Sequence, residues 1–128
     1  MSEPPKKGRL VTQSVGEVTA VFFQDARILD ETTVKAIADE LMALVDSTYK
    51  IKLLLDFSNV EYLSSAVLGK LVATYKKVQE GKGQMKLCAI KPAIKEVFKI
   101  TKLDKMFDIH DTQAAALNSF QTKKFGIF

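Results

Sequence analysis

Residues 53–69 read LLLDFSNVEYLSSAVLG, and the rest of the chain is organised around this stretch. The apolar run Ile51–Leu55, interrupted only by Lys52, stops at Asp56. A run this short and this apolar predicts a strand buried on both faces, as in a parallel sheet. The next segment, Asp56–Asn59, predicts a turn, because Asp, Ser and Asn side chains bond to nearby backbone groups.

Two serines follow this turn and stand directly before a helix. Ser64 and Ser65 precede apolar residues that recur at helical spacing, namely Val67, Leu68, Leu71, Val72, Tyr75 and Val78. Serine before such a run is a helix N-cap signal. The centre of the chain therefore reads as strand, loop, two serines and helix. We expect the rest of the chain to hold both serines at an exposed helix N-terminus.

The remaining chain alternates strand and helix patterns around this centre. The predicted strands are 10–15, 18–23, 51–55, 85–90 and 107–110, and the predicted helices begin near residues 31, 65, 92 and 113. Gly16-Glu17 separates the first two strands as a hairpin turn, and Gly81–Gly83 ends the second helix. The order ββαβαβαβα predicts an α/β fold with a mixed, mostly parallel sheet of about five strands and about four helices.

The central motif resembles that of the STAS domain, the fold of bacterial anti-sigma factor antagonists. The usual family pattern Asp-Ser-Ser-Gly-Leu-Gly falls on residues 64–69, with Ser64 in place of the acid, Ala66 in place of a serine and Val67 in place of a glycine. The Leu-Asp pair ending at Asp30 and the segment IKEVFKITKLDKMFDI, residues 94–109, also resemble the family. The similarity extends from about residue 10 to residue 120.

The resemblance implies a regulatory binding protein in the cytoplasm. Such a protein sequesters an anti-sigma factor that is also a serine kinase, and so frees a sigma factor. Phosphorylation of the family serine, here Ser65, releases the partner, and a PP2C-type phosphatase resets the switch. The implied partner-binding residues are Asp30, Ser64, Ser65, Ala66, Val67 and Lys70, and the implied loop-positioning residues are Asp56 and Ser58. Lys70 and Thr74 are expected to face outward on the helix.

Several alternative interpretations remain open at this point. The plainer interpretation of Asp30, which the sequence favours over a partner contact, is a helix cap, and Ser64 and Ser65 could both serve only as caps. The domain could also be an unphosphorylated STAS subunit of a larger signalling or lipid-transport assembly. A third alternative is a weak nucleotide-binding domain that attracts an anion at the helix N-terminus.

Composition excludes several other classes. The 128 residues carry a formal charge of +4, but the lysines are scattered and do not alternate with aromatic residues, so we expect no nucleic-acid partner. No apolar run approaches the roughly 18 residues of a membrane span. The single cysteine, Cys88, lies in an apolar run and the single histidine is His110, so we expect no disulfide, metal, cofactor or enzymatic activity.

The domain limits and the oligomeric state are also expectations. Residues 1–8 are expected to be disordered, residues 9–120 to form the domain, and the tail 121–128 either to fold back or to dock elsewhere. We expect a monomer or a weak dimer.

These patterns predict that the domain folds without a bound metal. Adding a chelator should leave the melting temperature unchanged, because one His and one Cys provide no clustered ligand set. Differential scanning fluorimetry with and without chelator measures this. A large fall in melting temperature, reversed by added metal, would contradict the prediction.

Overall fold

The computed structural model describes residues 9–125, with the side chains of residues 9–120. The expectations for residues 1–8 and for the end of the tail lie outside the described residues. In chain order the elements are β1 (Leu10–Val15), β2 (Val18–Phe23), β3 (Arg27–Ile28), α1 (Glu31–Ser47), β4 (Lys52–Asp56), β5 (Tyr62–Leu63), α2 (Ser65–Glu80), β6 (Gln84–Cys88), α3 (Pro92–Ile100), the 3-10 helix η1 (Leu103–Lys105), β7 (Asp108–His110) and α4 (Gln113–Phe125).

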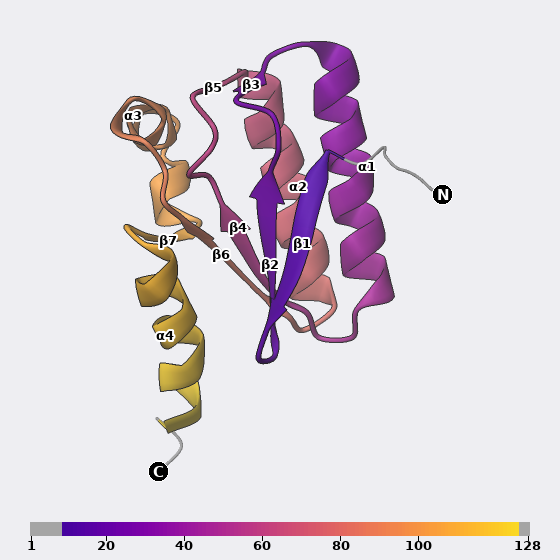
Figure 1. Ribbon diagram of the computed structural model, residues 1–128, viewed down its shortest axis with the longest axis vertical. Helices are drawn as coiled ribbons and strands as arrows, with labels where there is room; N and C mark the ends of the chain where they lie inside the picture. Colours follow the sequence, from indigo (N-terminus) through magenta and orange to yellow (C-terminus); the bar gives the residue numbers. More distant parts are fainter. Residues whose placement is uncertain (1–8, 126–128) are drawn as a thin grey trace.

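A five-stranded sheet in the order β1-β2-β4-β6-β7 forms the middle layer (Figure 1). The hairpin pair β1–β2 is antiparallel, and each of the other pairs is parallel. The prediction of a mixed, mostly parallel α/β sheet with four helices is therefore confirmed. Three elements were not predicted from the sequence: the strands β3 and β5, which form a separate two-stranded sheet, and the short helix η1.

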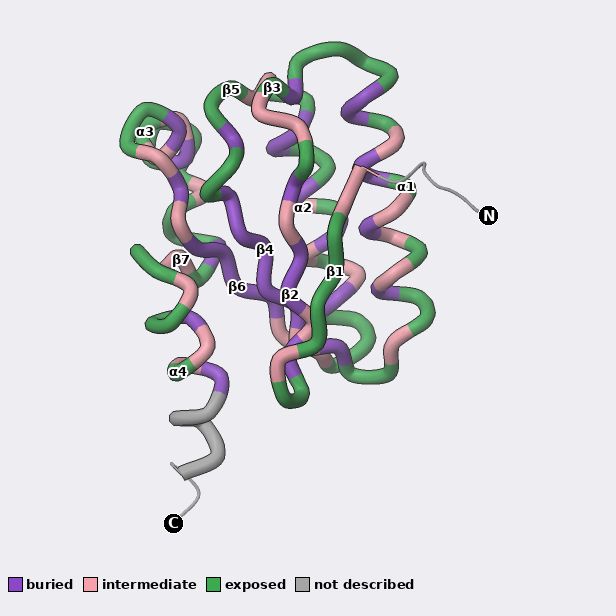
Figure 2. Tube along the Cα trace, in the orientation of Figure 1, coloured by how far each residue is buried: buried purple, intermediate pink, exposed green. Residues whose placement is uncertain are grey.

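The central strand β4 is buried on both of its faces (Figure 2). Leu53 and Leu55 belong to the large core cluster that also includes the inner faces of α1 and α2. Leu54 points the other way and packs in a smaller cluster with Ala116 and Phe120 of α4. Helices on both faces explain why this strand has no polar alternation, as expected for a parallel strand.

Phe57 lies in the segment predicted as a turn, but its side chain is fully buried. Its ring lies 4.8 Å from that of Phe23 and 6.4 Å from that of Phe98, measured between centroids. Its N–H donates to the carbonyl of Cys88 at 3.0 Å, beyond the last paired residue of β4. The chain thus stays attached to β6 for one more residue before it enters the loop.

The helix limits agree with the sequence pattern except at the C-terminus of α4. Helix α1 ends at Ser47 as predicted, whereas α4 continues to Phe125, five residues past the expected limit of the domain at residue 120. None of the helices within residues 9–125 is long and apolar enough to cross a membrane.

The end of α2 depends on a close approach between two backbones. The left-handed residue after the helix is Lys82, with φ of 63°, and not a glycine as the pattern suggested. Gly83 is required for a different reason, because a Cβ there would overlap the carbonyl oxygen of Ile51. At Gly69, within α2, a Cβ would have no described atom within 4 Å apart from its chain neighbours and the backbone of its own helix.

We predict opposite effects for alanine at these two glycines. Gly83→Ala should lower the free energy of unfolding by about 1–3 kcal/mol, because the Ile51 backbone must shift. Gly69→Ala should raise it by about 0.5–1 kcal/mol, because alanine is the better helix former. Urea denaturation of both variants measures the difference, and equal effects at the two sites would contradict the described packing.

Candidate functional site

The candidate site is built around the N-terminus of α2. Ser64 occupies the N-cap position, and its carbonyl accepts the N–H of Val67 at 3.1 Å. Its own N–H donates to the carbonyl of Ile28 in β3 at 3.0 Å. The parallel pairing of β3 with β5 continues this contact, since Arg27 lies opposite Tyr62. The first turn of α2 is therefore fixed against the strand that leads into α1.

The two serines differ sharply in accessibility. The Ser64 hydroxyl is buried and has no hydrogen-bond partner, so Ser64 caps the helix with its backbone alone. Ser65, the first residue of α2, is exposed. A helix N-terminus leaves backbone N–H groups without intrahelical partners and favours negative charge. Of the two hydroxyls, only that of Ser65 is open to another molecule.

The loop between β4 and β5 is held by the carboxylate of Asp56. This side chain is 5% exposed, and its Oδ1 accepts the Ser58 N–H at 2.8 Å. Gln113 Nε2 lies 3.4 Å from the second carboxylate oxygen. Ser58 is itself exposed, and its carbonyl accepts a hydrogen bond from Lys91 Nζ. Ser58 therefore takes part in the loop through its backbone.

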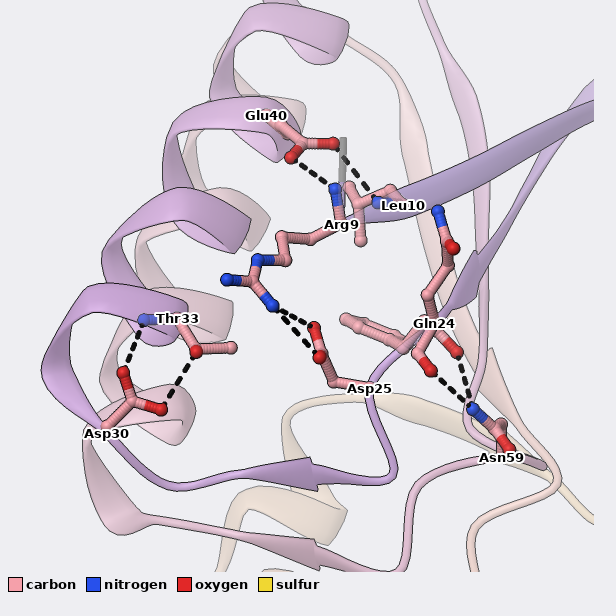
Figure 3. Close-up of polar contacts among 9 residues, drawn as sticks. Arg9, Leu10, Gln24, Asp25, Asp30, Thr33, Glu40 and Asn59 are labelled. Atoms are coloured by element: carbon pink, nitrogen blue, oxygen red, sulfur yellow. Dashed lines mark hydrogen bonds and ion pairs between the residues drawn. The ribbon is translucent and has the colours of Figure 1, made fainter. Parts of the chain in front are cut away.

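Asn59 fixes the other side of this loop and was not singled out from the sequence. Its Nδ2 donates to the carbonyls of Phe23 at 3.1 Å and Gln24 at 2.9 Å, at the end of β2 (Figure 3). Asn is common in turns for its bonds to local backbone, but this bond spans 36 residues of sequence. No local pattern could have revealed it.

Asp30 is the N-cap of α1, which was one of its two interpretations. Its carboxylate accepts from Thr33 twice, from the N–H at 3.1 Å and from the hydroxyl at 2.8 Å (Figure 3). These bonds from the Thr33 hydroxyl and then from its N–H lower the pKa of Asp30. The residue itself is exposed, so capping and a contact with another molecule are compatible.

Ala66 and Lys70 lie together, whereas Val67 is turned away. Ala66 and Lys70 are exposed and line an open groove of about 530 Å³ between α1 and α2. Val67 is 2% exposed and belongs to the core, so in this conformation its side chain cannot contact a partner, contrary to the expectation. Thr74 is also buried, so the expectation that it faces outward is wrong, and its hydroxyl donates to the Lys70 carbonyl at 2.8 Å.

The short strands and the residue directly after β3 provide three exposed side chains that were not singled out as site residues from the sequence. Tyr62 is 51% exposed and Leu29 is 45% exposed. The Arg27 guanidinium lies 4.8 Å from the centre of the Tyr62 ring, a cation–π contact. Two-residue strands carry no measurable periodicity, so only the paired backbone reveals that these residues border the first turn of α2.

Comparison with known proteins assigns this arrangement to a family. Residues 10–116 match the sequence model of the STAS domain. The chain belongs to the STAS domain family.

Relatives of this STAS domain are named as anti-sigma factor antagonists. BtrV of Bordetella bronchiseptica, so named, is 28% identical over 95 residues, which cover 74% of this chain and 81% of BtrV. The structure of an anti-sigma-factor antagonist STAS domain protein from Planctomyces limnophilus has a TM-score of 0.78 at 27% identity, covering 89% of this chain and 98% of that one. An anti-sigma factor antagonist from Mycobacterium paratuberculosis has a TM-score of 0.75 at 30% identity, covering 86% and 91%.

The single cysteine and histidine of this STAS domain are both engaged in the fold. Cys88 is fully buried, and burial together with the nearby Asp56 carboxylate raises the pKa of its thiol to about 12. The thiol therefore stays protonated at neutral pH, as expected of an inert core cysteine. His110 Nε2 lies 3.0 Å from Asp108 Oδ1. Within the described residues, no group of three or more His, Cys, Asp and Glu side chains could hold a metal ion.

The Asp30 cap predicts a pH-dependent contribution to stability. Because folding lowers the pKa of Asp30 from its ordinary 3.8, the cap contributes fully above pH 3.8 and is lost as pH falls through the lower folded value. Asp30→Ala should therefore melt at a lower temperature than the parent at pH 7, with a smaller difference at pH 2. Thermal denaturation at both pH values measures this. Asp30→Asn, which keeps the acceptor, should stay close to the parent at pH 7. A difference between parent and Asp30→Ala that is the same at pH 2 would contradict the assignment.

Proposed function

We propose that this STAS domain is an anti-sigma factor antagonist whose partner binding is switched by phosphorylation of Ser65. One observation carries the proposal: of the adjacent serines at the α2 N-terminus, Ser65 is exposed and the Ser64 hydroxyl is buried. A kinase can reach the Ser65 hydroxyl, but not the Ser64 hydroxyl, without unfolding the turn. The protein acts by binding, and no catalytic step is assigned to it.

The proposed partner is an anti-sigma factor that is also a serine kinase. Its contact surface on this domain comprises the exposed residues around the first turn of α2: Arg27, Leu29, Asp30, Tyr62, Ser65, Ala66 and Lys70. Tyr62 and Leu29 provide apolar area, and aromatic and arginine side chains are enriched at such contacts. While bound to this domain, the anti-sigma factor cannot hold its sigma factor, which is then free.

The physical basis of the switch is that phosphate changes the surface more than the fold. Phosphorylation adds about −1.5 to −2 charges. The helix N-terminus stabilises such a charge by about 0.3–1 kcal/mol. The first turn of α2 contains no acidic residue, and Ser64 stands where the usual family pattern has an acid, so no neighbouring carboxylate in this turn opposes the phosphate. A partner that packs on Ser65, however, must then bury that charge, and it dissociates.

Reversal requires removal of the phosphate from an exposed position. We assign this step to a PP2C-type phosphatase, which returns the domain to its binding form. The exposure of Ser65 supports this step, because the phosphate must be as accessible to the phosphatase as the hydroxyl is to the kinase.

Substitution of Ser65 separates binding from release. Ser65→Ala should bind the kinase that copurifies with the parent but should not release it on addition of ATP, because the phosphate acceptor is gone. Ser65→Glu should weaken binding at least tenfold, or about 1.4 kcal/mol, with little change in melting temperature. Calorimetric titration of each variant with the kinase measures both effects.

Ser64→Ala is the matched control one residue away. It removes a buried hydroxyl without a partner, so stability should be unchanged or slightly higher, and the switch should still work. Mass spectrometry after incubation with kinase and ATP locates the phosphate. The assignment fails if the phosphate lies on Ser64 or if Ser65→Glu binds as tightly as the parent.

A further inference from the structure

One edge of the main sheet is open and carries no charge. Strand β1 is the outermost strand on its side, and its sequence, LVTQSV, contains neither a charged residue nor proline. The opposite edge, β7, is three residues long, and Asp108 there is paired with Lys86 and His110. Proteins usually blunt exposed edges with short strands, charges or proline. The β7 edge has such protection, whereas β1 does not.

The hydrogen bonding of the hairpin shows which backbone groups face outward. In an antiparallel pair, residues that exchange hydrogen bonds alternate with residues that do not. Gln24 N–H donates to the Arg9 carbonyl at 3.1 Å, which makes Arg9 a bonded position. By alternation, Val11, Gln13 and Val15 bond to β2, while Leu10, Thr12 and Ser14 direct their N–H and C=O groups away from the sheet.

One end of this outward row is closed by a side chain. The Glu40 carboxylate on α1 accepts the Leu10 N–H at 3.1 Å and also binds the Arg9 N–H (Figure 3). No comparable contact within the described residues reaches the outward groups of Thr12 and Ser14. The open part of the edge is therefore short. It contains two backbone N–H donors and two carbonyl acceptors, those of Thr12 and Ser14.

The surroundings of this open segment leave room for another strand. Thr12, Gln13 and Ser14 are exposed, and Val11 is 47% exposed although it is apolar. On the α1 side, Thr12 borders an open groove of about 510 Å³. A strand added beside β1 would thus gain hydrogen bonds and cover apolar surface.

We propose that the β1 edge pairs with the β1 edge of a second copy of this chain, antiparallel, with Gln13 on the two-fold axis. This register sets Val11 opposite Val15 of the second copy, twice, and Thr12 opposite Ser14 of the second copy, twice. Each Thr12–Ser14 pair exchanges two hydrogen bonds through the outward groups. The two valine pairs lie on one face and the Thr–Ser pairs on the other, and no like charges are opposed.

The self-complementary register favours a second copy over an unrelated strand. The interface is small beside the 1,200–2,000 Å² of a typical stable complex, so the dimer is weak and forms at high protein concentration. The contact surface proposed for the anti-sigma factor is made by β3, β5 and the N-terminal turns of α1 and α2, and not by β1. Pairing therefore leaves the proposed partner surface of each copy free, and this inference does not depend on the proposed function.

Engineered cysteines test the register directly. Cys88 is fully buried, so a second cysteine on the surface is the reactive thiol. In Gln13→Cys the two thiols face each other across a non-bonded pair, with Cα atoms about 4.5 Å apart, within disulfide range. In the matched control Ser14→Cys the two Cα atoms would be about 8 Å apart, beyond that range. Mild oxidation should give a covalent dimer of Gln13→Cys only. Equal cross-linking of the two variants would overturn the register and the proposal.

Sedimentation equilibrium of the full chain tests the association itself. The parent should show a dimer fraction that rises with concentration up to about 1 mM. Gln13→Lys places two like charges on the axis and should weaken the dimer at least about tenfold, whereas the neutral strand former Gln13→Thr should not. Circular dichroism checks that both variants fold. A parent that stays monomeric at about 1 mM, or a Gln13→Lys variant that associates like the parent, would overturn the proposal.

Discussion

The position of Ser65 depends on the pairing of two strands that are each only two residues long. The carbonyls of Ala26 and Ile28 accept the N–H groups of Glu61, Tyr62 and Ser64, and these bonds place the start of α2 beside the start of α1. Isolated strands of this length would not persist in water. Here they do, because the buried strand β4 and the side chains of Asp56 and Asn59 fix the loop that leads into β5.

The same geometry separates the surface from the core within one helical turn. Ser65 and Ala66 face outward, while Val67 and Leu68 directly after them are buried in the main cluster. A modification of Ser65, as proposed, would therefore act next to a well-packed support. Because unpaired N–H groups at a helix N-terminus stabilise negative charge, a phosphate there would alter recognition with little effect on folding. A switch needs this combination of a changeable surface and an unchanging scaffold.

The sequence predicted the parts of this arrangement that repeat regularly and missed those that depend on distant contacts. The apolar run of β4 and the helical spacing from Val67 to Val78 predicted the strand, the helix and the order of the fold. These patterns could not show that Phe57 enters the core, since its polar neighbours predict an exposed turn while its own apolar side chain favours burial. Nor could they show that the Ser64 hydroxyl is buried or that Thr74 satisfies its own hydroxyl on the Lys70 carbonyl. Arg27 and Tyr62 were not predicted as site residues, because strands of two residues are too short to show an alternation of apolar and polar side chains.

Amide NMR of the domain with phosphoserine incorporated at position 65 tests most directly whether the surface switches while the fold is retained. If the proposed switch is correct, chemical-shift changes will be confined to the first turn of α2 and to β3 and β5, with the amides of β4 and β6 unchanged. Shift changes that extend through β4 and β6, or loss of the helical pattern in α2, would contradict it.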